Sequence, residues 1–179
     1  MGGFVKNYEP AMSFGEDVAE MYGDVQRGDE VAAVAFLAEL AGGGPALELA
    51  VGAGRIAIPL AARGIRVDGI DISTAMVAQL RAKPGGDQIA VTIGDFADVP
   101  VSGTYRLIYV VWNSLFNLLT QDDQVRCFEN VASTSPTMAP SSLRRARPTF
   151  STVCVITSTS TRKPSKWITC GWICFATIR

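Results

Sequence analysis

Residues 46–55 read Ala-Leu-Glu-Leu-Ala-Val-Gly-Ala-Gly-Arg, a short apolar run that leads into two glycines two positions apart. The run predicts a buried strand, and Gly52 and Gly54 predict a tight turn, because glycine adopts backbone angles that other residues avoid. Residues 55–63, which end before Gly64, predict a helix whose first amides lack partners within the helix. This strand-loop-helix stretch decides the fold, since the same alternation continues after it.

Strand and helix signals alternate from residue 46 to residue 131. After the first strand and helix, strands are predicted at 65–70, 89–93 and 105–112, and helices at 74–83, capped by Ser73, and at 122–131. Two further helices are predicted before this region, at 16–22 and 29–41. Strands that alternate with helices form a parallel sheet covered on both faces. The sequence therefore predicts a doubly wound α/β fold, whose ligands bind at the carboxyl ends of the strands.

Carboxylates stand at or near the ends of three successive predicted strands, at Glu48, Asp71 and Asp95. The loop alone also fits a dinucleotide-binding pattern, so a nicotinamide-dependent oxidoreductase is one interpretation. Glu48 argues against it, because a negative charge beside the loop repels a pyrophosphate and attracts a cationic ligand. Asp71 can accept both hydroxyls of a ribose, and Asp95 can accept an adenine amino group. Each acid could instead serve the protein alone, as a cap or an acceptor for loop amides, and Asp68 is interpreted as a solvated residue.

The region resembles the class I S-adenosylmethionine-dependent methyltransferases, particularly small bacterial proteins of the broad methyltransferase-domain type. The matching segments, in order, are 46–57, 67–73, 91–96 and 105–113. The resemblance implies a Rossmann-like parallel sheet with strands one to four, S-adenosylmethionine as the cofactor, and methyl transfer to an unidentified acceptor. Ala50 departs from the pattern, because the commonest loop of the family has glycine there.

The resemblance also implies a set of cofactor-binding positions at the loop and at the next two strand ends: Glu48, Ala50, Gly52, Gly54, Asp71, Ile72, Met76, Asp95 and Phe96. Glu48 would face the methionine amino group, Asp71 the ribose hydroxyls, and Asp95 with Phe96 the adenine. Ile72 and Met76 would pack near the purine.

The composition restricts the partners. The chain is 48% hydrophobic and 18% charged, with a net charge of -1, which indicates a globular protein and does not favour nucleic acid as a partner. A small-molecule acceptor is therefore expected. No apolar stretch is long enough to span a membrane, and the first twenty residues are acidic rather than leader-like, so we expect a cytoplasmic protein. Without histidine, and with four cysteines that lack paired spacing, neither a metal site nor a histidine base is expected, and no catalytic residue is assigned.

The composition changes abruptly near residue 132. All 17 acidic residues lie at or before Glu129, whereas seven of the 16 basic residues lie after it, and Ser and Thr make up 17 of the 47 residues from Ser133 on. The tail is either a low-complexity segment or an out-of-frame translation, and we favour the second, because Trp167 and Trp172 do not suit a solvated tail.

We therefore expect an S-adenosylmethionine-binding domain over residues 1–132, truncated or frameshifted before its later strands, and an atypical tail, disordered or out of frame, over residues 133–179. Activity would be reduced or lost. Residues 150–157 are β-favouring and could add a fifth strand, but nothing after them alternates as a βα sheet requires. The strand at 105–112 would then form an exposed edge.

Overall fold

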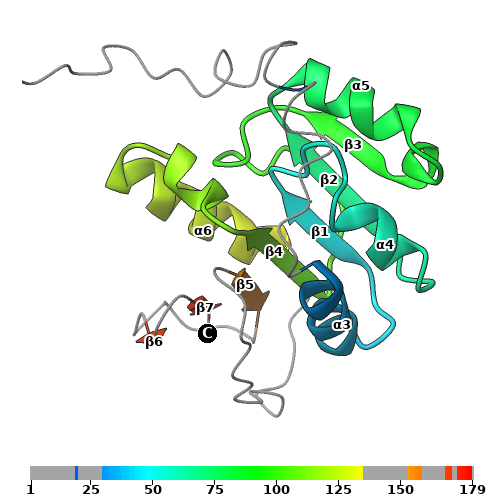
Figure 1. Ribbon diagram of the computed structural model, residues 1–179. Helices are drawn as coiled ribbons and strands as arrows, with labels where there is room; N and C mark the ends of the chain where they lie inside the picture. The colour runs from blue at the N-terminus through cyan, green and yellow to red at the C-terminus, as the bar shows by residue number, and fades with distance from the viewer. Residues whose placement is uncertain (1–18, 20–29, 135–152, 159–167, 171–172, 179) are drawn as a thin grey trace, which may run out of the picture.

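The computed structural model describes residue 19 and residues 30–134, 153–158, 168–170 and 173–178. In chain order its elements are α3 (Glu30–Ala41), β1 (Ala46–Leu49), α4 (Ala57–Ala61), β2 (Val67–Asp71), α5 (Thr74–Ala82), the 3-10 helix η1 (Gly86–Gln88), β3 (Ala90–Ile93), β4 (Leu107–Val111), the 3-10 helix η2 (Ser114–Asn117), α6 (Gln121–Thr134), β5 (Val153–Ser158), β6 (Ile168–Cys170) and β7 (Ile173–Ile178) (Figure 1). The helix predicted at 16–22 lies outside the described residues except for residue 19.

The predicted alternation between residues 29 and 131 is confirmed, with most bounds shifted by one or two residues. Ser73 caps α5 as expected, since its side chain accepts a hydrogen bond from the Met76 amide at 3.2 Å. The helix predicted from Arg55 begins later, at Ala57, because the turn that starts in the glycine loop continues through Ile56. Pro59 is thus the third residue of α4, in the first turn, where its missing N–H costs no helical hydrogen bond.

The sheet has the strand order β3-β2-β1-β4-β5-β7-β6. The strands β3, β2, β1 and β4 are parallel to their neighbours, and Glu48 of β1 pairs with Gly69 on one side and Tyr109 on the other. The chain runs outward from β1 to β3 and then returns to the other side of β1 with β4. The carboxyl end of β1 is therefore the point at which the strand order reverses, where doubly wound sheets bind their ligands.

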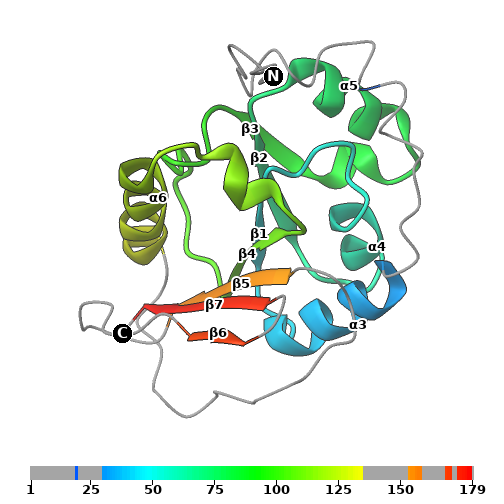
Figure 2. The same cartoon turned by 60° about the vertical axis from the view of Figure 1, so that its left-hand side comes forward.

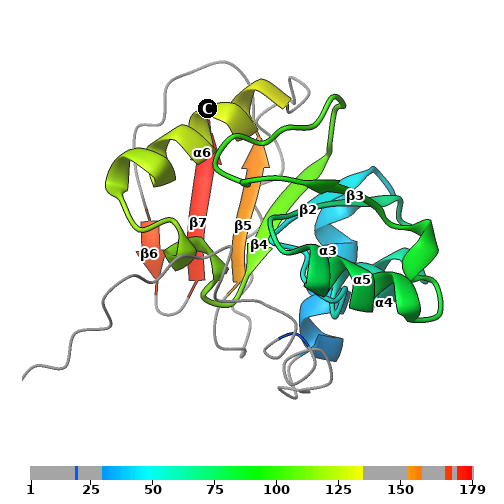
Figure 3. The same ribbon diagram turned by 90° about the horizontal axis from the view of Figure 1, so that it is seen from above.

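The C-terminal strands extend the sheet beyond β4 (Figure 3). The strand predicted at 150–157 is present as β5, which pairs antiparallel with β4. The expectation that β4 is an exposed edge is therefore wrong. In turn, β7 pairs parallel with β5, and β6 pairs antiparallel with β7. All residues described beyond Thr134 lie in the strands β5, β6 and β7.

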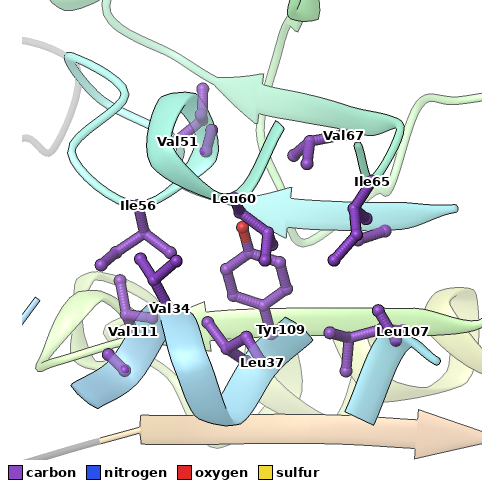
Figure 4. Packing of buried hydrophobic residues seen from close by; sticks show 14 of the residues in the cluster. Val34, Leu37, Val51, Ile56, Leu60, Ile65, Val67, Leu107, Tyr109 and Val111 are labelled. Atoms are coloured by element: carbon purple, nitrogen blue, oxygen red, sulfur yellow. The ribbon is translucent and has the colours of Figure 1, made fainter. Parts of the chain in front are cut away.

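Helices cover both faces of the sheet, with α6 on one side and α3, α4 and α5 on the other (Figure 2). The side chains of β4 alternate between two clusters of buried residues: Tyr109 and Val111 point toward α3 and α4, whereas Ile108 and Val110 point toward α6. Tyr109 is fully buried among aliphatic side chains of α3, α4 and the neighbouring strands (Figure 4). A phenol in this position needs a hydrogen-bond partner inside the core.

Asp68 of β2 is not a solvated residue, contrary to the expectation from the sequence. It is 8% exposed, and its carboxylate accepts hydrogen bonds from the Tyr105 hydroxyl at 2.9 Å and from the Arg66 guanidinium at 2.7 Å. Burial and this bond to the carboxylate raise the pKa of Tyr105 to about 12, so the phenol remains a donor. Asp68 thus links β2 to the segment that leads into β4.

Candidate functional site

In the loop after β1, every second residue has a left-handed backbone conformation. Ala50, Gly52 and Gly54 have φ angles of 57°, 54° and 74°, in the left-handed region that residues with a side chain avoid. The two glycines meet this requirement without strain. Ala50 does not, because its Cβ crowds the backbone in that conformation. The position at which the sequence departs from the family pattern is therefore a strained one.

We expect the substitution Ala50→Gly to stabilise the protein slightly. Relief of the left-handed strain gains about 1–2 kcal/mol, and the greater freedom of glycine in the unfolded chain takes back roughly 0.4–1 kcal/mol, together with the lost packing of one methyl group. The free energy of unfolding from urea titration should thus rise by about 0.5 kcal/mol. The matched control is Ala53→Gly in the same loop, where no positive φ occurs and a buried methyl is lost. A lower stability for Ala50→Gly than for wild type would contradict the strain argument.

The glycines are also required by the packing behind the loop. A Cβ placed on Gly54 would lie 2.9 Å from Cδ1 of Ile58 and 3.0 Å from Cγ of Leu80, and one on Gly52 would lie 3.2 Å from Cε of Met76. This packing is a second reason for the glycines, besides the turn and the approach of a ligand. The helices α4 and α5 pack against the loop from the other side, so a larger residue at position 54 would require the side chains of Ile58 and Leu80 to shift.

Asp71, at the carboxyl end of β2, binds the loop directly. Its Oδ2 accepts the Gly52 amide at 2.7 Å, and its Oδ1 accepts the Ser73 amide at 2.8 Å. Burial raises the pKa of this carboxyl, and the amides of Ser73, Gly52 and Ile72 oppose that rise. The role as an acceptor for loop amides, left open by the sequence, is thus realised. An ionised carboxylate has about four acceptor directions, and these two bonds leave capacity for a ligand.

Glu48 lies on the sheet face covered by α3 and α4 and is 2% exposed. Its Oε2 accepts the Tyr109 hydroxyl at 3.0 Å, which provides the buried phenol with its partner. Burial raises the pKa of Glu48 to about 8; the negative charge of Asp71 acts in the same direction, whereas Tyr109, Arg55 and the Ala57 amide oppose it. Burial and the adjacent acid also raise the pKa of Tyr109 well above its usual range. In the free protein at neutral pH, Glu48 is therefore largely a neutral, hydrogen-bonded acid rather than an exposed charge.

Asp95 and Phe96, which follow β3, differ in how far they are buried. Asp95 is half-buried, and its Oδ1 accepts the Ala97 amide at 2.8 Å, a local turn contact. Phe96 is 8% exposed and packs in the core cluster beneath α6. The amide of Gly94 donates to the Asp71 carbonyl at 3.0 Å, which holds this strand end beside that of β2.

The two apolar positions after Asp71 also differ from one another. Ile72 is 40% exposed at the strand end, whereas Met76 is 6% exposed and packs with Ala53 beneath the loop. The family resemblance implies that both lie near a purine. In the folded protein Ile72 is open to a ligand, and Met76 supports the loop from inside.

Two basic side chains contact the loop region in ways that the sequence did not indicate. The Arg55 guanidinium lies 4.3 Å from the ring centroid of Trp112 and 3.8 Å from Oε1 of Glu30. Trp112 follows β4 with a positive φ of 53°. The Lys83 ammonium, from the end of α5, donates to the Ala53 carbonyl at 3.2 Å. These pairs are separated by 25 to 57 residues in the chain, so no local sequence signal could reveal them.

The described part of the chain contains no cluster of three or more His, Cys, Asp or Glu side chains able to hold a metal ion. Within the same residues no helix is both long and apolar enough to cross a membrane. Cys127 of α6 carries a free thiol that is buried in the core cluster beneath the helix.

A Rossmann-like sheet with a glycine loop after its first strand and a buried acid after its second is an arrangement that binds nucleotide-containing cofactors, and solved methyltransferases share this fold. A family model described as "Methyltransferase domain" matches residues 46–135, and the chain belongs to this family. The cofactor of the class is S-adenosylmethionine. No curated protein gave a significant match to this chain.

Solved methyltransferases share the fold. The CcbJ methyltransferase from Streptomyces caelestis is 30% identical, with a TM-score of 0.63, over 74% of this chain and 60% of its own. The glycopeptide N-methyltransferase MtfA, complexed with sinefungin, is 23% identical, with a TM-score of 0.55, over 62% and 51%. The magnesium protoporphyrin IX methyltransferase ChlM from Synechocystis PCC 6803, with bound S-adenosylmethionine, is 20% identical, with a TM-score of 0.57, over 77% and 80%. The chain thus spans little more than half the length of CcbJ and MtfA.

Proposed function

We propose that this chain binds S-adenosylmethionine at the carboxyl ends of β1, β2 and β3 and transfers its methyl group to a small-molecule acceptor. The observation that carries the proposal is the contact between Asp71 and the amide of Gly52. This contact places a buried carboxylate, which can accept further hydrogen bonds, beside the glycine loop. Both lie where the strand order of the sheet reverses. A ribose whose hydroxyls donate to Asp71 would lie with the rest of its nucleoside along the β2 and β3 ends.

The adenine would then extend toward β3. Ile72 is the exposed apolar side chain beside Asp71, so it can cover one face of the purine. We assign the amino group of the purine to Asp95, which has acceptor capacity beyond its bond to Ala97. Phe96 and Met76, both buried, would act indirectly by holding Asp95 and the loop in place.

The methionine end of the cofactor would lie along Ala50, Gly52 and Gly54, with Glu48 beneath the loop. When bound, S-adenosylmethionine supplies a methyl group that its sulfonium already makes electrophilic. The chain then has to bind this group, orient it toward the acceptor atom and exclude water. Any proton released by the acceptor would pass to a carboxylate, a phenol or solvent, because the sequence has no histidine. We assign no catalytic residue.

A small acceptor is supported by the modest net charge of -1, which gives no reason to bind a polyanion. CcbJ and MtfA, by their names, are methyltransferases of which the second acts on a glycopeptide. A cytoplasmic location is part of the proposal, and the free thiol of Cys127 accords with a reducing compartment.

We further propose that the methyltransferase domain ends near residue 132 and that residues 133–179 derive from a shifted reading frame. The family match ends at residue 135, close to the change in composition, which supports this boundary. Resequencing of the coding DNA should locate a one-base change near this codon that restores an acidic, glycine-containing continuation. If no such change exists, the tail is genuine and the frameshift proposal fails.

Calorimetric titration of the full chain with S-adenosylhomocysteine, S-adenosylmethionine and NAD tests the cofactor. We expect saturable binding of the first two and no binding of NAD at the same concentrations. Binding of NAD alone would reject the proposal in favour of an oxidoreductase. Failure to bind any of the three by a chain with a folded circular dichroism spectrum would also reject it.

A further inference from the structure

One face of α5 forms the support behind the glycine loop. Its residues Met76 and Leu80, and Lys83 directly after the helix, are spaced at i, i+4 and i+7, which places them in one row. Each contacts a different residue of the loop. Cε of Met76 lies under Gly52, Cγ of Leu80 lies against Gly54, and Nζ of Lys83 donates to the carbonyl of Ala53 between them.

The first two contacts are apolar and buried, whereas the third is a charge-assisted hydrogen bond of 3.2 Å. Lys83 ends α5 in an extended conformation, with φ of -88° and ψ of 148°, while its amide still donates to the Leu80 carbonyl. The turn that follows is tightly determined, because a Cβ on Gly86 would lie 1.8 Å from the Leu80 oxygen. The position from which the lysine reaches the loop is therefore fixed by the end of the helix.

Within the loop, the amide of Gly54 donates to the Val51 carbonyl at 3.1 Å, and two side chains add restraints from outside. Gly52 and Gly54 have few backbone restrictions, and peptide groups between glycines can rotate at little cost. Asp71 holds the amide of Gly52 from the side of the strand ends. Lys83 holds the carbonyl of Ala53 from behind, so the Val51–Gly52 and Ala53–Gly54 peptide groups are each held by a side chain from outside the loop.

We propose that Lys83 is a positioning residue of the cofactor site, whose ammonium fixes the peptide groups of Gly52 to Gly54 in the orientation that receives the methionine end of S-adenosylmethionine. This inference rests on the proposed function. Lys83 acts through the loop and does not touch the ligand. Its removal should weaken binding without removing any group that contacts the cofactor.

The test compares Lys83→Met, which keeps the aliphatic stem but loses the donor, with Lys83→Arg, which keeps a cationic donor. Arg81→Met is the matched control, because it removes a charge from the exposed side of the same helix end. For the full chain, we expect Lys83→Met to raise the Kd for S-adenosylhomocysteine about five- to tenfold, which corresponds to about 1 kcal/mol for one such hydrogen bond. Lys83→Arg should restore the affinity to within about twofold of wild type, and Arg81→Met should leave it unchanged.

Amide hydrogen exchange of the ligand-free protein provides a readout that does not depend on cofactor binding. Peptides that cover residues 50–55 should exchange faster in Lys83→Met than in wild type, while peptides of β4 should not change. Unchanged exchange in the loop overturns the inference, whether or not the protein binds the cofactor. Equal affinities of Lys83→Met and wild type, or a loss that Arg81→Met shares, would also overturn it while leaving the proposed function intact. A wild-type protein that binds no S-adenosylhomocysteine rejects the proposed function instead.

Discussion

The substitution Asp71→Asn should weaken S-adenosylhomocysteine binding by about 100-fold or more, since each ribose hydroxyl bonded to a charged acceptor contributes roughly 1.5–3 kcal/mol. Asparagine has nearly the same shape, but one of its two polar atoms is a donor. It cannot accept from the Gly52 and Ser73 amides and from two hydroxyls at once. Calorimetric titration with S-adenosylhomocysteine measures the loss.

Two further variants separate the role in binding from the role in folding. Asp87→Asn removes an exposed carboxylate of η1 and should bind normally. Asp71→Glu keeps the charge but moves it by one methylene, so we expect an intermediate loss. Because Asp71 also holds the loop, thermal unfolding of each variant is measured alongside. If folded Asp71→Asn binds within about threefold of wild type, Asp71 serves the loop alone and does not bind the ribose.

The substitution Glu48→Gln should make the protein more stable at pH 8, by roughly 2–4 kcal/mol, because burial disfavours the ionised acid. The folded protein holds Glu48 with a pKa of about 8, against 4.5 for an ordinary glutamate. The raised value favours folding fully below pH 4.5, and this contribution is lost as the pH rises toward 8. Wild-type stability should fall over that interval, whereas the fall should be smaller in the variant. Urea unfolding between pH 5 and pH 8 measures the difference.

The same substitution should weaken cofactor binding. A bound ammonium group near Glu48 would favour the ionised acid, so binding by wild type should become tighter as the pH rises from about 6 to about 7.5, below the range in which the α-amino group of the ligand loses its proton, and should release a proton. Glutamine cannot ionise, so the affinity of Glu48→Gln should be roughly tenfold lower at about pH 7.5 and nearly constant over the same interval. Titration in two buffers of different ionisation enthalpy detects the proton. Glu39→Gln, on the exposed side of α3, is the control for loss of a carboxylate.

If Glu48→Gln is more stable than wild type but binds the cofactor more weakly, Glu48 serves ligand binding and lowers the stability of the fold. A pH-independent affinity of wild type, together with increased stability of Glu48→Gln, would instead show that the acid serves only the internal bond to Tyr109. The two measurements therefore decide between the two roles that the sequence left open for Glu48.

Much of the site is predictable from short-range patterns. The apolar run before Gly52, the Ser73 cap and the alternation of strands and helices each depend on residues that are neighbours in the chain. The parallel direction of β3, β2, β1 and β4 follows from that alternation, and with it the gathering of Glu48, Asp71 and Asp95 near one edge. The left-handed backbone at Ala50 was visible only as a departure from the family pattern, because the alanine itself does not indicate its φ angle.

Contacts between distant segments were not predictable. Asp68 looked like a surface residue and is buried, because Tyr105 comes from a segment 37 residues away to donate to it. The strand after β4 was predicted, but its antiparallel pairing was not, since direction depends on how the chain returns to the sheet. Likewise, Lys83 reaches the carbonyl of Ala53 only once α5 packs behind the loop.

The sequence by itself determined the class of fold, the glycine loop and the three carboxylates at the strand ends, because these follow from local periodicity and from the order of the elements. Only the tertiary structure decided the state of those groups. With a pKa raised to about 8, Glu48 is mainly the neutral acid at neutral pH and accepts a hydrogen bond from Tyr109, and Asp71 binds the loop amides in the ligand-free protein. Burial sets these properties, and burial is created by side chains from elements far apart in the chain, whose meeting depends on the packing of the whole domain.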